Sequence, residues 1–202
     1  MSDRRARRKE RVRRDLLDAA VALFSERGIY ATRIEDITER ADLGKGAFYN
    51  YFDSKDALVA ALVTEGVEIL DERYLKPLDR GVSAEVQLAE IVRRHAEFFD
   101  DHPEYVVLFH QARGLMKFDG SAPPLRDVFT DYLARVGRSL PAPVPPAVWT
   151  DEARSDMAAA LVGALAGYRS FRLASGQAPQ KGTIVRALSA GLPSMIPGVA
   201  EK

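Results

Sequence analysis

Apolar residues recur every three or four positions through the first quarter of the chain, the spacing of a helix with one buried face. The pattern predicts a first helix from about residue 11 to Gly28, because glycine commonly closes a helix. Residues up to about 10 are expected to form a basic arm ahead of it. The apolar positions of this helix are Leu16, Leu17, Ala20, Val21, Leu23 and Phe24.

Two short helices joined by a tight turn are predicted next. Thr32 is placed to cap the first of them, with Glu35 reaching back three residues later in a capping box. Asp42-Leu43-Gly44 forms the turn, since aspartate tolerates a left-handed backbone and glycine is an acceptable N-cap. The second short helix runs from about Lys45 to Tyr51. A longer helix, capped by Asp53-Ser54, then extends toward Pro77.

This pair of helices has the composition of a DNA-reading element. The small residues Gly46 and Ala47 allow the first turn of the second helix to approach the floor of a major groove. Lys45 and Asn50 are the expected base readers, because lysine donates to guanine and asparagine can pair with adenine. The flanking residues are expected to hold phosphates. The predicted DNA contacts are Arg11, Thr32, Arg33, Lys45, Gly46, Ala47, Tyr49, Asn50, Tyr51 and Lys55.

The charge distribution agrees with a nucleic-acid partner although the formal net charge of the 202 residues is zero. Residues 1–14 contain eight arginines and lysines against two acidic residues, a net charge of +6, so the rest of the chain carries −6. A basic end on an acidic body suits a protein that meets phosphate on one face. A solvated basic tail is the alternative interpretation.

From about Arg11 to Val67 the chain resembles the DNA-binding domain of the TetR family of bacterial transcriptional regulators. The resemblance is carried by an ordered series of matches, with Asp42 where glycine is usual and Gly44 where serine is usual. It implies an all-helical homodimer that binds duplex DNA and whose second domain binds a small effector. The matches are Leu17-Asp18-Ala19-Ala20, Phe24, Glu26-Arg27-Gly28, Ala31-Thr32, Asp36-Ile37, Arg40-Ala41, Lys45-Gly46-Ala47-Phe48-Tyr49, Tyr51-Phe52 and Ser54-Lys55.

The predicted organisation is therefore a basic arm (1–10), a helix-turn-helix domain (11–70) and a larger helical domain (71–202), with about nine helices in all. Helices are expected over about 83–99, 103–114, 124–140, 150–174 and 181–191. The prolines between residues 141 and 146 predict an extended linker. Small residues on the helix over 150–174, with larger apolar residues on the last helix, indicate close helix packing, either inside a monomer or, as the resemblance implies, across a dimer axis. The small residues are Ala160, Gly163, Ala164 and Gly167, and the larger ones are Ile184 and Leu188.

Aromatic and polar residues of the second domain are candidates for an effector cavity. Core packing is the more common role of such aromatic residues, and a surface position or a core hydrogen bond is the alternative for the polar ones. The three histidines at 95, 102 and 110 have no metal-ligand spacing, and the absence of cysteine excludes disulfides and thiolate metal sites. The candidates are Phe98, Phe109, His110, Arg113, Phe129, Tyr132, Trp149 and Tyr168.

The function predicted from the residues and the resemblance is a ligand-responsive transcriptional regulator in the cytoplasm, a repressor released from a palindromic operator. An architectural DNA-binding protein without a ligand is the second hypothesis. A helical enzyme is the third, and no Ser-His-Asp order, phosphate loop or dinucleotide glycine motif supports it. No cofactor, metal or membrane partner is expected, since apolar runs are cut by charges before spanning length.

Overall fold

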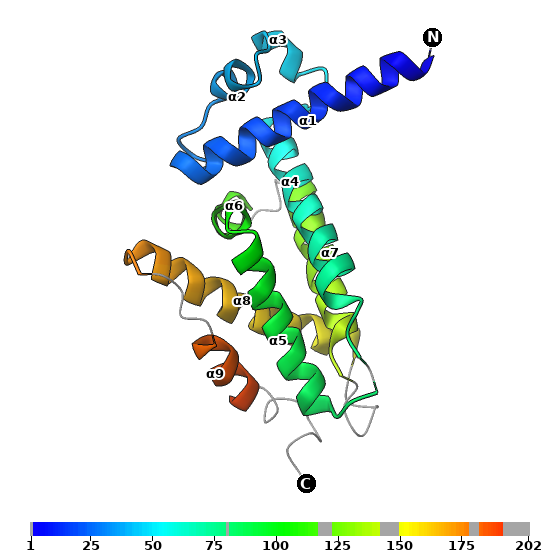
Figure 1. Cartoon of the computed structure of the whole chain (residues 1–202), viewed down its shortest axis with the longest axis vertical. Coiled ribbons are helices and arrows are strands. Elements are labelled where there is room, and N and C mark those ends of the chain that lie inside the picture. The colour runs from blue at the N-terminus through cyan, green and yellow to red at the C-terminus, as the bar shows by residue number, and fades with distance from the viewer. Residues whose placement is uncertain (1, 80, 117–122, 142–149, 178–181, 192–202) are drawn as a thin grey trace. The chain divides into compact units, whose positions relative to one another are not determined.

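Every regular element in the described part of the chain is helical, which confirms the all-α class (Figure 1). The computed structural model describes residues 2–79, 81–116, 123–141, 150–177 and 182–191. Within these ranges the helices are α1 (Ser2–Arg27), α2 (Ile34–Arg40), α3 (Lys45–Phe48), α4 (Lys55–Ile69), the π-helical segment η1 (Leu70–Leu75), α5 (Ala84–Asp101), α6 (Glu104–Leu115), α7 (Pro123–Ser139), α8 (Asp151–Ala174) and α9 (Thr183–Gly191).

The chain divides into two compact units. The first comprises Met1–Glu65 with Val107–Val128, and the second comprises Gly66–Val106 with Phe129–Lys202. The first unit thus contains α1 to α3 and most of α6, and the second contains α5, α8 and α9. A domain boundary near residue 70 stays a prediction.

The core of the first unit is built from the apolar face that the sequence predicts for α1. Leu16, Ala20 and Phe24 are at most 1% exposed. Ile37 of α2 and Leu58 of α4 are fully buried. Burying a large apolar side chain stabilises a fold by roughly 1.5–3 kcal/mol, so this face fixes how α1, α2 and α4 pack together.

Helix α1 begins at Ser2, well before the start near residue 11 that the sequence predicts. The basic residues expected as an arm are therefore the first turns of the helix. Arginine, lysine and alanine are good helix formers, and residues 1–14 contain neither glycine nor proline to interrupt them.

The N-terminus of α2 differs from the predicted capping box by one residue. Arg33, not Thr32, occupies the N-cap position, and its backbone N–H donates to the Asp36 carboxylate at 2.8 Å. The Thr32 hydroxyl instead donates to the Gly28 carbonyl at 2.8 Å. The carboxylate of Asp36 therefore does the work that Glu35 was expected to do.

Helix α3 is shorter than predicted, ending at Phe48 where the sequence indicated Tyr51. The chain nevertheless stays in a helical turn, because the N–H groups of Asn50 and Tyr51 donate to the carbonyls of Ala47 and Phe48. Such i to i+3 bonds are common where a helix ends. The predicted cap of α4 is confirmed, since the Ser54 hydroxyl accepts from the Ala57 N–H at 3.1 Å.

Helix α5 lies at the centre of the second unit and packs against η1, α8 and α9. Polar side chains form hydrogen bonds between α5 and its neighbours at three positions along the helix. Gln87 donates to the Ser139 carbonyl of α7, His95 bonds to Tyr132 of α7, and Arg169 of α8 binds the Asp100 carboxylate. Thr150 caps α8, its hydroxyl accepting from the Ala153 N–H.

Candidate nucleic-acid interface

One buried aromatic residue holds α3 on the first unit. Phe48 is fully buried, and its ring contacts those of Tyr49 and Phe52 at centroid distances of 5.4 and 5.7 Å. The neighbouring residues are open to solvent, with Tyr49 54% exposed. A Cβ atom added to Gly46 would meet nothing within 4 Å. Helix α3 therefore presents a narrow, uncovered first turn.

The turn before α3 has the geometry that the sequence predicts. Asp42 is in the left-handed region at φ 54°, and the Leu43 N–H donates to the Thr38 carbonyl at 2.8 Å. Gly44 is the N-cap of α3, and its carbonyl accepts from the Ala47 N–H. Without a side chain at Gly44, no cap bond is made to the first amides of α3.

The base-reading candidate Lys45 is held by an acidic neighbour on α2. Its ammonium forms an ion pair with the Glu35 carboxylate. The bond raises the pKa of Lys45 and lowers the pKa of Glu35. Both side chains are at least half exposed, so the pair is weak and solvent-screened. Lys45 is thus charged and positioned, and it must leave Glu35 to contact DNA.

Two predicted phosphate contacts have other partners in the structure. Thr32 is fully buried with its hydroxyl bonded to Gly28, so that hydroxyl is not available to DNA. The Lys55 ammonium donates to the carbonyls of Ile29 and Thr32, each at 3.0 Å. Lys55 therefore fastens the start of α4 to the connection between α1 and α2, a role that its sequence position did not reveal.

Replacing Lys55 with alanine is expected to reduce the free energy of unfolding by about 1.5–3 kcal/mol, because two part-buried carbonyls lose a charged donor. Urea unfolding followed by circular dichroism measures this loss. The same substitution at the exposed Lys9 is the control and should leave the midpoint unchanged. An unchanged midpoint for Lys55→Ala, together with weaker DNA binding, would return Lys55 to the list of phosphate contacts.

Gln111 of α6 also holds the connection between α1 and α2. Its side-chain oxygen accepts from the Ile29 N–H at 2.6 Å. Gly28, in the left-handed region at φ 85°, leaves just enough room, since an added Cβ would lie 2.8 Å from the Gln111 amide nitrogen. Gln111 was not among the site residues predicted from the sequence, because its partner lies 82 residues away.

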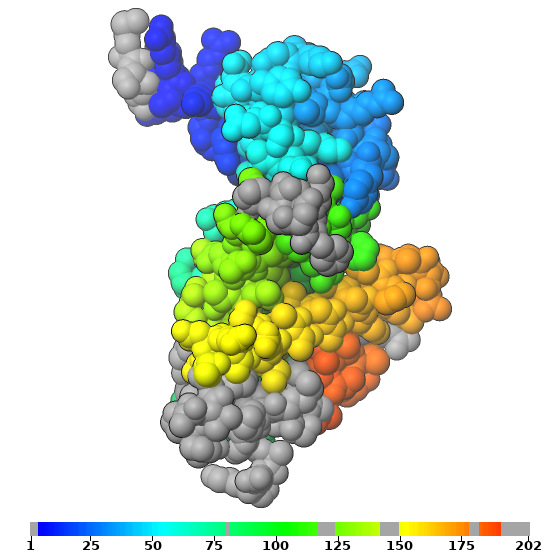
Figure 2. All heavy atoms as spheres, turned by 180° about the vertical axis from the view of Figure 1, so that it is seen from behind, coloured from blue at the N-terminus to red at the C-terminus, as the bar shows by residue number. Residues whose placement is uncertain are grey.

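The remaining predicted contacts lie at the surface. Arg11, Arg33 and Asn50 are exposed, and Ala47 and Tyr51 are half-buried. The segment from α2 through α3 is uncovered on the face shown in Figure 2, and the basic first turns of α1 extend beyond the body of their own unit. The structure therefore places a bare helix turn, a lysine, an asparagine and phenolic hydroxyls on an accessible surface.

The family described as "Bacterial regulatory proteins, tetR family" matches residues 16–62 of this chain, from the middle of α1 into α4. The HTH-type transcriptional repressor KstR2 of Rhodococcus jostii strain RHA1 is 31% identical over 97 residues, or 48% of each chain. Residues 16–62 therefore form a DNA-binding domain of the TetR type.

Other relatives extend the likeness beyond this domain. The HTH-type transcriptional repressor DhaR of Mycobacterium sp. strain GP1 is 32% identical over 127 residues, covering 62% of this chain and 59% of DhaR. The crystal structure of a TetR-like transcriptional regulator from Rhodococcus sp. RHA1 covers 89% of this chain and 92% of its own, at 29% identity and a TM-score of 0.57.

The chain spans about half the length of the curated relatives that it matches most strongly. These relatives are regulators of transcription, not enzymes, so the helical-enzyme hypothesis is set aside. Over the part of the chain that the structure describes, no helix has the length and apolarity needed to cross a membrane.

The predicted effector residues fall into both units. Phe109, His110 and Arg113 belong to the first unit, with Phe109 buried and His110 exposed. Trp149 lies outside the described residues. In the second unit Phe98, Phe129 and Tyr132 are at most 7% exposed, and Tyr168 is half-buried. Their assignment to an effector site stays a prediction.

His95 and Tyr132 form a buried polar pair in the second unit. The His95 Nε2 lies 2.5 Å from the Tyr132 hydroxyl, and the two rings stack at 5.7 Å. His95 is fully buried, and its Nδ1 has no hydrogen-bond partner. Burial, with a smaller contribution from the charge of Arg169, lowers the pKa of His95 to about 3. The imidazole is therefore neutral in the folded protein.

This neutral histidine makes the protein less stable in acid. In the unfolded chain His95 titrates near 6.5, so between pH 6.5 and 3 the unfolded state holds a proton that the folded state lacks. The free energy of unfolding is expected to fall by about 2 kcal/mol between pH 7 and pH 5 because of this group. Above pH 6.5 its full contribution is present.

Urea unfolding at pH 7 and pH 5 measures the contribution of His95. The double variant His95→Phe/Tyr132→Phe replaces both polar groups with apolar rings, the first somewhat larger than imidazole, and should lose this part of the pH dependence. Tyr132→Phe alone keeps the histidine and should retain it. Equal pH dependence in the double variant and the wild type would contradict the assignment.

The predicted dimer residues lie on an accessible face of α8 and on α9. Ala160 is exposed, and Gly163, Ala164 and Gly167 are half-buried. Added Cβ atoms at Gly163 and Gly167 would meet nothing within 4 Å. One turn further along the same face Phe171 is 77% exposed. Ile184 and Leu188 of α9 are half-buried.

Proposed function

We propose that this TetR-family protein is a cytoplasmic transcriptional repressor that binds a palindromic DNA operator as a homodimer and is released by a small-molecule effector. The single observation that carries the proposal is the accessible first turn of α3. Gly46 has open space around it while Phe48 holds the turn in place from below. A helix end of this kind fits a major groove, where a larger residue would hold it off.

The surrounding charges support DNA as the partner. Lys45, Arg33 and the basic first turns of α1 supply exposed cations, while Tyr49 and Tyr51 supply hydroxyls for phosphate oxygens. Thr32 and Lys55 are left out of the proposed interface because their polar groups bind within the protein. KstR2 and DhaR, which match this region, are named transcriptional repressors.

The homodimer is supported by the exposed face of α8. Small residues over two turns let a second helix approach closely, and Phe171, which is 77% exposed, adds a large apolar group to the same face. A two-fold axis through such a contact makes the two copies of α3 equivalent. They would then meet major grooves about one turn, roughly 34 Å, apart.

Release by an effector requires a ligand that prefers the state unable to bind DNA. Moving the population from mostly competent to mostly incompetent takes an affinity difference of about 10⁴-fold between the two states. An architectural protein without a ligand remains the alternative function. A ligand cavity in the second unit, described below, favours the regulator.

Selection of operator sequences from a randomised duplex library tests the proposal. The wild type is expected to enrich an inverted repeat, with binding that weakens steeply as salt rises. The variant Asn50→Ala is expected to enrich the same repeat with a relaxed preference at one position in each half-site, a loss of about 1–3 kcal/mol in discrimination.

Glu39→Ala, at an exposed position of α2, is the control for Asn50→Ala and should keep the wild-type preference. No enrichment by the wild type at low ionic strength would refute the function. Unchanged preference in Asn50→Ala would refute only the assigned role of Asn50.

A further inference from the structure

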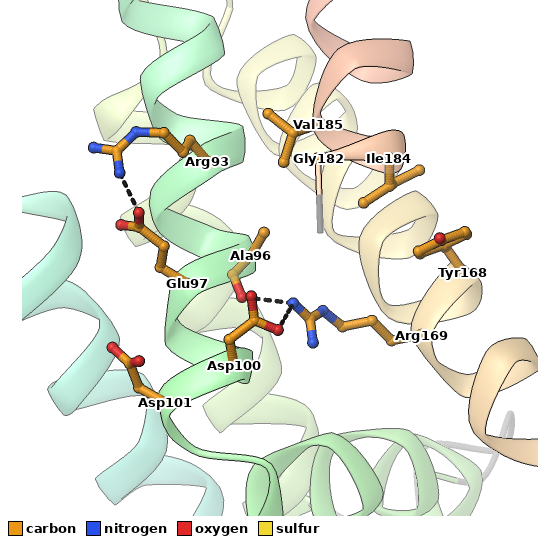
Figure 3. Close-up of a pocket in the computed structure, with 10 residues that line it drawn as sticks. All are labelled: Arg93, Ala96, Glu97, Asp100, Asp101, Tyr168, Arg169, Gly182, Ile184 and Val185. Atoms are coloured by element: carbon orange, nitrogen blue, oxygen red, sulfur yellow. Dashed lines mark hydrogen bonds and ion pairs between the residues drawn. The ribbon is translucent and has the colours of Figure 1, made fainter. Parts of the chain in front are cut away.

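A cavity of about 510 Å³ lies between α5, α8 and α9 in the second unit (Figure 3). Its volume is within the range of roughly 300–1,000 Å³ that small-molecule sites occupy. Side chains from α5 form one wall, Tyr168 and Arg169 of α8 another, and Ile184 and Val185 of α9 a third. The cavity combines an apolar side with a strongly polar one.

Arg169 is the polar group most deeply set in this cavity. The residue is 5% exposed, and its guanidinium reaches across from α8 to α5. Both of its hydrogen bonds leave from Nη2, to the Ala96 carbonyl at 2.6 Å and the Asp100 carboxylate at 2.7 Å. Its Nε is buried without a partner. Buried donors are normally satisfied, so this N–H calls for an acceptor oxygen.

The charges around the cavity determine which chemical class of ligand can supply that acceptor oxygen. Three carboxylates line it against two guanidinium groups, an excess of one negative charge. Arg93 is already bound to Glu90 and Glu97, and Arg169 to Asp100. A carboxylate or phosphate ligand would therefore meet unfavourable charge, whereas a neutral oxygen satisfies Arg169 at no such cost. Glu97 shares its charge with Arg93, so the excess negative charge lies on Asp101, which accepts from the Tyr74 hydroxyl, and a cation is favoured at this acidic edge.

The remaining wall is suited to an aliphatic chain. Ile184, Val185 and Ala96 contribute methyl groups, and the aromatic ring of Tyr168 extends this surface. On α5, Glu97 and Asp101 are one turn apart, about 6 Å along the axis. The acidic edge and Arg169 line the same cavity.

We propose that this cavity binds an aliphatic amine that carries a neutral carbonyl oxygen. The oxygen accepts from Nε of Arg169, the ammonium lies beside Glu97 and Asp101, and the methylene chain covers Ile184 and Val185. This inference deepens the proposed function by naming the chemical class of its effector, and it rests on that function only for the effect on DNA.

Four six-carbon probes separate the contributions of the ammonium, the carbonyl oxygen and a negative charge to binding. They are 6-aminohexanamide, hexylamine, hexanamide and hexanoate. Isothermal titration calorimetry on the full chain is expected to give the tightest binding for 6-aminohexanamide. Hexanamide lacks the ammonium and hexylamine the oxygen, so each should bind about tenfold more weakly. Hexanoate should not bind measurably.

Two variants locate the binding in the cavity. Glu97→Gln is expected to weaken 6-aminohexanamide by about tenfold and to leave hexanamide unchanged, because only the amine loses its partner. Glu85→Gln on the first turn of the same helix is the matched control and should bind all probes as the wild type does. Val185→Phe fills the cavity and should abolish binding while the circular dichroism spectrum is retained.

Equal binding of all four probes, binding of hexanoate alone, or binding that survives Val185→Phe would overturn the proposal. So would the absence of heat with every probe, which would also be the result if a second copy covered the cavity. These outcomes leave operator binding by the protein untouched. Conversely, failure to bind any duplex would refute the proposed function and would not alter the calorimetric result.

Discussion

Gly46→Leu is expected to weaken operator binding by about 100-fold or more while leaving the fold intact. An added Cβ at Gly46 meets no atom within 4 Å, so the protein itself offers no obstacle to the larger side chain. Leucine also has the higher helix propensity, which favours the short α3. On DNA, however, the side chain would stand between the first turn of α3 and the base edges.

Fluorescence anisotropy with a labelled operator measures the loss of affinity, and thermal unfolding followed by circular dichroism checks the fold. Glu85→Leu adds the same side chain at an exposed position of α5 and is the matched control. Wild-type affinity in Gly46→Leu would show that α3 does not enter the groove. A lowered unfolding temperature would instead show that Gly46 packs against the protein.

Gly163→Leu is expected to dissociate the homodimer by raising its dissociation constant about 100-fold or more. Within one protomer the added side chain has open space, so the monomer should fold normally. Across a close helix contact it would push two backbones apart and leave gaps, which removes packing along the whole stripe. Operator affinity should fall as well, because two α3 helices would no longer be held together.

Sedimentation equilibrium over a range of concentrations measures this change, again with Glu85→Leu as the control. An intact dimer in Gly163→Leu would move the interface away from α8. A protein that is monomeric before any substitution would refute the dimer itself, and the operator would then be a single half-site.

Much of the fold could be predicted because the determining signals are local. The apolar spacing of α1, the left-handed residue Asp42 and the hydroxyl cap of α4 each act within a few residues. The errors came where neighbouring residues compete for one role. The carboxylate of Asp36, and not that of Glu35, accepts the N–H of the N-cap residue of α2. Helix α1 begins at Ser2 because the sequence has no glycine or proline there to interrupt it.

The candidate sites were less predictable because they depend on contacts between distant residues. Lys55 looks like a phosphate ligand until its ammonium is seen on the carbonyls of Ile29 and Thr32. Gln111 binds Ile29 from 82 residues away. Arg169 had no place among the candidates, because its burial and its unpaired nitrogen arise only from the packing of α5, α8 and α9.

The ion pair of Lys45 with Glu35 has a consequence for the proposed contact with DNA. Any phosphate or guanine that takes the lysine displaces an anion that the protein supplies itself. Because both side chains are at least half exposed, this displacement costs little on any sequence. Discrimination between sequences would therefore depend on the other groups of the proposed interface and not on this pair.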